Sequence, residues 1–362
     1  MTAFDIPEIL PDKVEEAKRK ILKVWNMEDL DLEDPCILKR TSSKTRFGGV
    51  WQAPVGDYTS DIPKPTAMIN DPELDLEYQL YAVRFDIDSL NQGYCNLPSI
   101  FPYFGICVIP SAFGCEIKFP KSSHPIARPL FEDPQDVYKL RMPNLREEGL
   151  CKRVLDRIDY FQEKTKGKIP IRGQTVNCPL DIAVQLWGMK KFKESISSHP
   201  EEIHHLMDLV TDAIIEFTRI QAERIENRFR YDHLRIWHSH GLSIIGDVSG
   251  LMSAAEYEEL VRPYHVRISE AFDGISLRNC GQCAQVLPCY ASLKGFQGFD
   301  VYLETNDQEK VAEAISNKGA LLRPLSDKEH IQLLRGKAGL FLAVDEVQGL
   351  NVEQARDALL RK

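Results

Sequence analysis

One stretch of this chain carries the strongest structural signal: Leu242-Ser243-Ile244-Ile245-Gly246-Asp247-Val248-Ser249-Gly250-Leu251-Met252-Ser253. Its apolar beginning predicts a strand, and the small and acidic residues that follow predict a turn. Ser253 can then cap a helix, because Glu256 lies at the capping-box spacing from it. The stretch therefore predicts a strand-to-helix junction with Asp247 at the end of the strand.

A second junction of the same kind follows. Residues 274–277 predict a short strand that runs into Arg278-Asn279-Cys280-Gly281. In a βα-barrel, the ends of successive parallel strands meet at one rim, where such proteins keep their chemistry. We therefore expect Asp247, Arg278 and Cys280 to lie at a common rim. There Asp247 would accept a proton or bind a polar substrate, or it would simply be an acid favoured by a helix N-terminus.

Strands and helices continue to alternate towards the C-terminus. The pattern predicts strands at residues 299–304, 320–324 and 338–345 and helices at 306–317 and 351–360. This alternation is typical of an α/β fold with a parallel sheet. We expect a single (β/α)8 TIM barrel domain over residues 1–362, of which 131–362 is the most regular part.

The N-terminal part of the chain has a different sequence pattern. Residues 13–25 predict a helix, but frequent prolines between residues 34 and 135 interrupt any long periodicity. We expect short strands and loops there, among them a buried strand at residues 106–110. Residues 1–130 are therefore expected to form an irregular, elaborated N-terminal region of the barrel.

Composition excludes several functional classes. A net charge of -9 and a pI near 5.6 disfavour nucleic acid and anionic lipid as partners, because both attract basic surfaces. No apolar run reaches the roughly 18 residues of a membrane span, and the first residues lack the pattern of a signal peptide. Nine scattered cysteines favour reduced thiols over a disulfide framework. We expect a soluble, cytoplasmic protein.

Part of this chain resembles a known family. The residues concerned are Gly250-Leu251-Met252-Ser253, Tyr257-Glu258-Glu259-Leu260-Val261-Arg262-Pro263-Tyr264 and Cys280-Gly281. They resemble the uroporphyrinogen decarboxylase superfamily, and are similar in motif to its corrinoid-dependent methyltransferase branch. In that branch, the segment that corresponds to residues 278–281 reads His-x-Cys-Gly. Arg278 stands here in the place of its histidine.

The resemblance implies an enzyme that moves a methyl group between a small donor or acceptor and a cobamide, carried on a partner corrinoid protein. The residues it implies are Cys280, Arg278, Asp247 and Asp345 for catalysis and Gln52, Trp51, Asn177, Gln185 and His240 for substrate binding.

The branch also holds a zinc ion with a histidine, a cysteine and a second cysteine near the C-terminus. Gap-free matching places Asp345 at the last of these positions, and a guanidinium at Arg278 cannot ligate a cation. Two alternatives stay open. Either Cys280 and Asp345 recruit another zinc ligand, such as Glu304 or one of the histidines at 238 and 240, or no zinc binds and Arg278 pairs with Asp345. Arg278 would then lower the pKa of the Cys280 thiol or anchor an anionic substrate.

Two other functions remain as alternatives. The decarboxylases carry Arg-Gln-Ala-Gly-Arg-Tyr near the N-terminus, and Gln52-Ala53 and Tyr58 match it. Trp51 and Val55 stand in the arginine places, which opposes a carboxylated tetrapyrrole as substrate because such a substrate needs cationic donors. The changed zinc motif also leaves a non-catalytic binding barrel as an alternative.

Overall fold

The computed structural model describes residues 8–40, 65–120, 125–228, 236–345 and 348–361. Its main sheet has seven strands in the order β1-β9-β8-β7-β6-β5-β4, and every neighbouring pair is parallel. These strands are β1 (Ile37–Arg40), β4 (Val176–Asn177), β5 (Leu242–Ile245), β6 (Ile275–Arg278), β7 (Phe296–Asp300), β8 (Ala320–Leu325) and β9 (Gly339–Asp345). A small antiparallel sheet pairs β2 (Ile117–Lys118) with β3 (Ile126–Ala127).

An extended segment at residues 95–100 joins the two edges of the main sheet. At the β1 edge, the backbone N–H of Cys95 donates to the carbonyl of Ile37 at 2.8 Å. At the other edge, Ile100 forms a parallel bridge with Ile171, a few residues before β4. The segment therefore lies between the two edges of the sheet, in the place that an eighth strand has in the expected α/β barrel.

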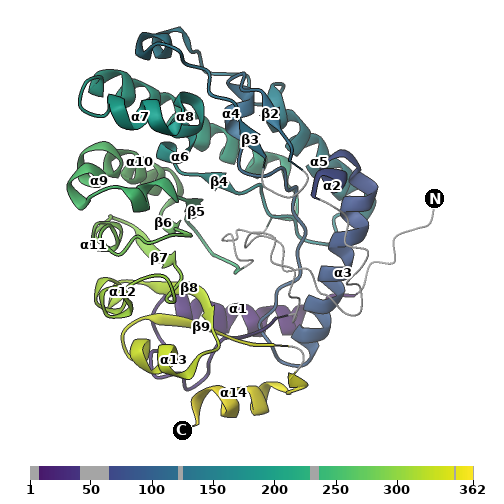
Figure 1. Ribbon diagram of the computed structural model, residues 1–362. Coiled ribbons are helices and arrows are strands. Elements are labelled where there is room, and N and C mark those ends of the chain that lie inside the picture. The colour runs from purple at the N-terminus through teal and green to yellow at the C-terminus, as the bar shows by residue number, and fades with distance from the viewer. Residues whose placement is uncertain (1–7, 41–64, 121–124, 229–235, 346–347, 362) are drawn as a thin grey trace.

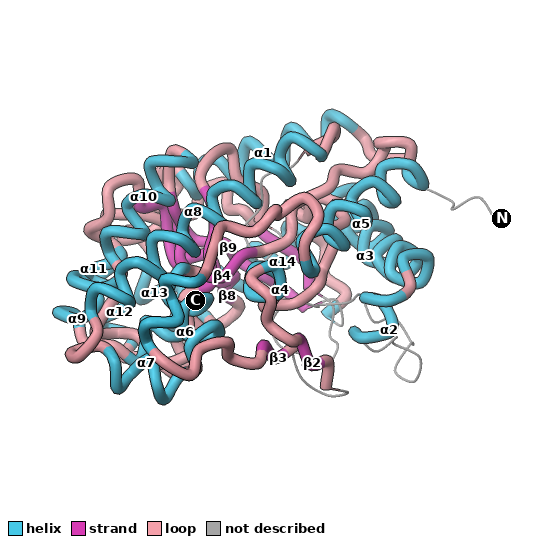
Figure 2. Tube along the Cα trace, turned by 90° about the horizontal axis from the view of Figure 1, so that it is seen from above, coloured by secondary structure: helices cyan, strands magenta, loops and turns pink. Residues whose placement is uncertain are grey.

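Helices surround these strands. Figure 1 shows the helices that follow β4 to β8 along one side of the strands, with α3 and α5 on the opposite side. Figure 2, turned by 90°, shows the magenta strands of the main sheet among cyan helices, with β2 and β3 at the lower edge. The α-helices are α1 (Pro11–Trp25), α2 (Pro65–Asn70), α3 (Pro72–Asn91), α4 (Val108–Ala112), α5 (Gly149–Thr165), α6 (Pro179–Trp187), α7 (Met189–Ser195), α8 (Pro200–Arg224), α9 (Ala254–Leu260), α10 (Arg262–Phe272), α11 (Leu287–Tyr290), α12 (Gln308–Ile315), α13 (Lys328–Leu334) and α14 (Val352–Leu360), and the 3-10 helices are η1 (Pro134–Lys139) and η2 (Val248–Leu251).

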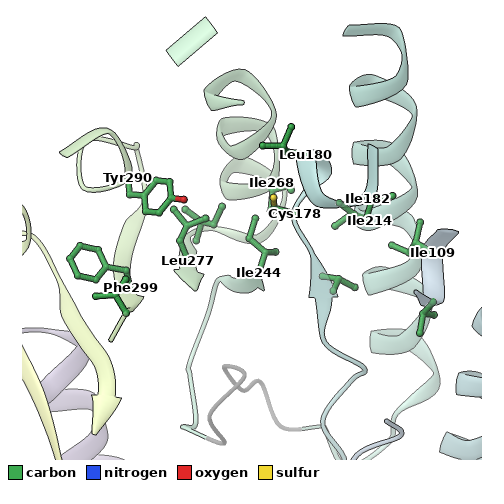
Figure 3. Close-up of a cluster of buried hydrophobic side chains, with 14 of the residues drawn as sticks. Ile109, Cys178, Leu180, Ile182, Ile214, Ile244, Ile268, Leu277, Tyr290 and Phe299 are labelled. Atoms are coloured by element: carbon green, nitrogen blue, oxygen red, sulfur yellow. The ribbon is translucent and has the colours of Figure 1, made fainter. Parts of the chain in front are cut away.

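The main hydrophobic core lies between the sheet and its helices. Leu277 of β6 and Phe299 of β7 belong to this core and are fully buried (Figure 3). Successive side chains on a strand point to opposite faces. Arg278 and Asp300 follow these two residues and therefore point into the barrel.

Helix α1 covers the amino ends of the strands. Its buried residues belong to a second core cluster that also contains Phe341 of β9. A Cβ on Gly339, the first residue of β9, would lie 2.1 Å from the carbonyl oxygen of Val24, so only glycine allows this approach. Trp25 Nε1 also donates to the carbonyl of Trp237 at 2.8 Å. The amino end of the barrel is thus closed, and its polar rim is the carboxyl end.

Several local predictions are confirmed. Ser253 and Glu256 form the predicted capping box at the start of α9. The helices expected from residue 13, from Pro200 and at residues 351–360 correspond to α1, α8 and α14. Local signals were sufficient here because caps and helical periodicity act within one or two turns.

Three local predictions are wrong. Residues 106–110 form no strand, and helix α4 begins at Val108, because a short apolar run does not distinguish strand from helix. Strand β7 ends at Asp300, so Glu304 lies in a turn. The expected loops around residue 72 are replaced by the 20-residue helix α3, whose N-cap is Asp71. Pro72 begins this helix, since proline is tolerated in the first turn.

Candidate active site at the carboxyl end of the barrel

The ends of β5 and β6 are joined by hydrogen bonds. The backbone N–H of Cys280 donates to Asp247 Oδ1 at 2.7 Å. Asn279 Nδ2 donates to the carbonyl of Gly246 at 2.7 Å, and the N–H of Gly281 donates to Asn279 Oδ1 at 2.9 Å. The structure therefore brings Asp247 and Cys280 to one rim, as the sequence predicts.

A buried carboxyl group, that of Asp181, forms hydrogen bonds with the end of β5. Asp181, in the first turn of α6, accepts from the N–H of Asp247 at 3.0 Å and from Cys178 Sγ at 2.9 Å. Burial raises the pKa of Asp181 to about 7, and the nearby charge of Asp247 acts in the same direction. Sequence reasoning missed Asp181. The available signal was an acid inside the otherwise apolar run that follows Pro179.

Arg278 pairs with Asp300 and not with Asp345. Its Nε lies 3.5 Å from Asp300 Oδ2, while Asp345 Oδ1 lies 3.7 Å from Arg40 Nε. Both pairs join residues in register on neighbouring parallel strands. Strand β6 is not a neighbour of β9 in the sheet, so the alternative in which Arg278 pairs with Asp345 is wrong.

Asp300 is shared by two guanidinium groups. Arg323 Nε of β8 lies 2.8 Å from its Oδ1, and the guanidinium of Arg323 stacks on the ring of Tyr302 at 3.6 Å. Arg278 and Asp300 are 3% and 1% exposed, so this ion cluster lies within the barrel. Arg278 also lies near Cys280, and the two side chains interact electrostatically.

Cys280 is the exposed cysteine of this chain, and the other eight are buried. Desolvation by the surrounding protein raises the pKa of its thiol above the ordinary value, and Arg278 opposes this only in part. Arg278 therefore acts in the expected direction, but the effect of burial on the pKa of the thiol is larger. The thiol is mainly protonated at neutral pH.

The residues considered for zinc do not fit a zinc site. Among the residues that the structure describes, no group of three histidines, cysteines or acids is placed to hold a metal ion. Asp345 faces Arg40, and Glu304 is exposed in a turn. His240 precedes β5, at the amino end of the barrel, where its ring lies 5.4 Å from that of His238. Neither histidine can reach Cys280 from there.

The remaining substrate-binding candidates have different positions. Asn177 is buried at the carboxyl end of β4, next to the rim. Gln185 lies near the end of α6, about two turns away from that rim, and is half-buried. Trp51 and Gln52 lie outside the described residues. The structure therefore supports the placement of Asn177 and does not bring Gln185 or His240 to the site.

A cavity of about 250 Å³ opens beside the ion cluster, at the ends of β1 and β8. Its lining includes Arg40, Tyr302, Glu304 and Arg323. Pockets for small-molecule ligands begin at about 300 Å³, so this cavity suits a small substrate and does not enclose a ligand as large as a corrinoid.

The fold and the rim define an α/β-barrel protein with its polar and reactive residues at the carboxyl ends of the strands. The profile of the uroporphyrinogen decarboxylase (URO-D) family matches residues 94–322. This chain belongs to the uroporphyrinogen decarboxylase family. In the described part of the chain, no helix is both long and apolar enough to cross a membrane.

Individual relatives come from two branches of this family. The chain is 25% identical over 219 residues to a methylated-thiol–coenzyme M methyltransferase of Methanosarcina mazei, covering 59% of this chain and 55% of that protein. It is 26% identical over 174 residues to a uroporphyrinogen decarboxylase of Xanthomonas axonopodis pv. citri, covering 46% of this chain and 45% of that protein. The chain thus spans about half the length of the curated relatives it matches, and both relatives are enzymes by name.

A solved methyltransferase from Methanosarcina mazei has the same fold. The two structures superpose with a TM-score of 0.59 at 19% identity, covering 82% of this chain and 86% of the other. This likeness confirms the α/β-barrel fold.

Proposed function

We propose that this chain is a methyltransferase that moves a methyl group between a small molecule and a cobamide presented by a partner corrinoid protein. The single observation that carries the proposal is the exposed Cys280 thiol, held at the rim through its backbone N–H by Asp247. The methyltransferase among the relatives supports this reading over others in the family.

The chain's own residues have distinct roles in this proposal. Cys280 and Arg278 contact the small molecule, because one is exposed at the rim and the other lies beside its thiol. Asp247 positions Cys280 and can accept the proton that an acceptor loses when it is methylated. Asp345 keeps Arg40 in place at the opposite side of the rim.

The cobamide would supply the cobalt that carries the methyl group. The described cavity is too small for it, so it would be presented at the open rim and not enclosed. No step in this proposal uses zinc, because the described residues do not form a zinc site.

Anaerobic incubation with methylcobalamin and a panel of small nucleophiles tests the proposal. We expect the protein to accelerate loss of the methylcobalamin visible spectrum with at least one acceptor. An unchanged spectrum with every acceptor tried would reject methyl transfer.

Decarboxylation of a carboxylated tetrapyrrole is a second candidate. The guanidinium groups of Arg40, Arg278 and Arg323 favour it, since such groups bind carboxylates. Trp51 and Val55 in the places of the decarboxylases' two arginines oppose it. Release of CO2 from uroporphyrinogen, measured alongside the methylcobalamin assay, distinguishes the two functions.

A further inference from the structure

The cavity at the ends of β1 and β8 contains guanidinium groups with incomplete hydrogen bonding. Arg40 Nη2 donates to Ser326 Oγ at 2.9 Å, but its buried Nε has no hydrogen-bond partner among the described residues. Arg323 stacks on Tyr302, and its buried Nη2 likewise has no partner among those residues. A buried unpaired donor costs free energy unless a ligand or water satisfies it.

The existing carboxylates do not satisfy these arginines. Arg323 Nε lies 2.8 Å from Asp300 Oδ1 but without the alignment of a hydrogen bond, and Asp300 is shared with Arg278. Arg40 has only the longer contact of 3.7 Å to Asp345. Three guanidinium groups thus share two carboxylates in the described part of the rim.

The two arginines also repel each other. Burial lowers the pKa of Arg40, and the positive charge of Arg323 acts in the same direction, against the attraction of Asp345 and Glu304. A bound anion between them would remove this repulsion.

Other acids line the cavity but have their own contacts. Asp327 Oδ1 accepts from the N–H of His330 at 3.0 Å, and Asp86 Oδ1 accepts from Asn96 Nδ2 at 3.2 Å. Glu304 is exposed at the mouth, and no ion pair joins it to either arginine among the described contacts. Lys39 also lines the cavity, and its Nζ donates to Gln92 Oε1 at 3.0 Å.

We propose that Arg40 and Arg323 form an oxyanion-binding site that holds a carboxylate or phosphate group of the small substrate. Guanidinium groups match both anions through paired N–H donors. The inference rests on the proposed function, because it assigns a substrate class to the same rim.

The position of the site fits a substrate that reaches Cys280. Strands β8 and β6 are separated by β7 in the sheet. Two strand spacings amount to about 10 Å, so a short chain with its anionic end in the cavity can extend to the thiol.

Calorimetric titration of the full-length protein at constant ionic strength tests the site, with propionate, inorganic phosphate and neutral propionamide as probes. We expect one saturable site for at least one of the anions and none for propionamide. Tighter binding of propionate would assign a carboxylated substrate, and tighter binding of phosphate a phosphorylated one. An absence of saturable binding for both anions would overturn the proposal.

Arg40→Gln and Arg323→Gln provide two independent variants, and Arg219→Gln is the control because Arg219 is exposed on α8. We expect each of the first two to weaken anion binding by at least about tenfold and the control to bind like the wild type. Wild-type affinity in both Arg40→Gln and Arg323→Gln would contradict the assignment. Arg40→Gln keeps the test valid if Arg323→Gln unfolds, since Arg40 is more exposed.

These titrations use no corrinoid, so the two proposals fail separately. Anion binding without methyl transfer would reject only the proposed function. Methyl transfer without anion binding would reject only the oxyanion site.

Discussion

Asp247 accepts a hydrogen bond from the backbone N–H of Cys280 at 2.7 Å, and this contact ties the end of β5 to the end of β6. It fixes the only exposed cysteine of the chain at the rim of the barrel. The proposed chemistry depends on this contact because a group that contacts the substrate must be held in one geometry to act efficiently.

Asp247→Ala removes the acceptor, whereas Asp247→Asn keeps an oxygen at the same place. We expect the alanine variant to lose about 0.5–1.5 kcal/mol of stability and at least about tenfold in the rate of methyl transfer. The asparagine variant should lie between the alanine variant and the wild type. Urea unfolding and rate measurements on all three proteins check this, and equal losses in both variants would argue against a positioning role.

Alkylation of the native protein with iodoacetamide should modify Cys280 first. The other cysteines are buried, so mass spectrometry should find one alkyl group, on Cys280. Because desolvation raises the pKa of this thiol, its reaction at pH 7 should be slower than that of free cysteine. Arg278→Gln should slow it further. Initial labelling of another cysteine, or faster labelling than free cysteine, would contradict this description.

Asp181 should make stability depend on pH. Its pKa is about 7 in the folded protein, above the value near 4 of an unfolded chain, so the folded state binds the proton more tightly. Its contribution to stability is therefore present below about pH 4 and is lost as the pH rises to about 7. Relative to Asp181→Asn, the wild type should lose on the order of a few kcal/mol over this range. Parallel pH profiles of the two proteins would contradict this.

A buried ion pair should stabilise the packing of α3 against α5. Asp75 accepts from Arg157, and their side chains are 2% and 5% exposed. Asp75→Ala leaves the charge of Arg157 uncompensated, and we expect a loss of about 3–5 kcal/mol. Asp88→Ala is the control, because Asp88 is exposed on the same helix. Equal unfolding midpoints for the two variants would show that the pair contributes nothing.

The fold and the meeting of Asp247 with Cys280 at the rim could be predicted from the sequence because their signals are local. The capping box of Ser253 and Glu256 and the strand end at Asp247 depend on residues a few positions apart. The rim then follows from the rule that parallel strands in a barrel end at one side.

The ion pairs could not be predicted because they depend on strand register. Arg278 lies in register with Asp300, and Arg40 with Asp345. Matching motifs along the sequence does not show which strands are neighbours, and it led to the wrong partner for Arg278. Asp181 was missed because its role depends on contacts with Asp247 and Cys178, which the fold brings to it.

The most direct test of the account is the rate at which Cys280→Ser consumes methylcobalamin with an acceptor that the wild type methylates, compared with the wild type and with Cys115→Ala. Cys115 is a buried cysteine that follows α4 and serves as the control. We expect wild-type and Cys115→Ala proteins to remove the methylcobalamin spectrum at similar rates and Cys280→Ser to be at least about tenfold slower while still folded. A folded Cys280→Ser variant with the wild-type rate would contradict the central claim that methyl transfer takes place at the rim, with the small molecule held against this thiol.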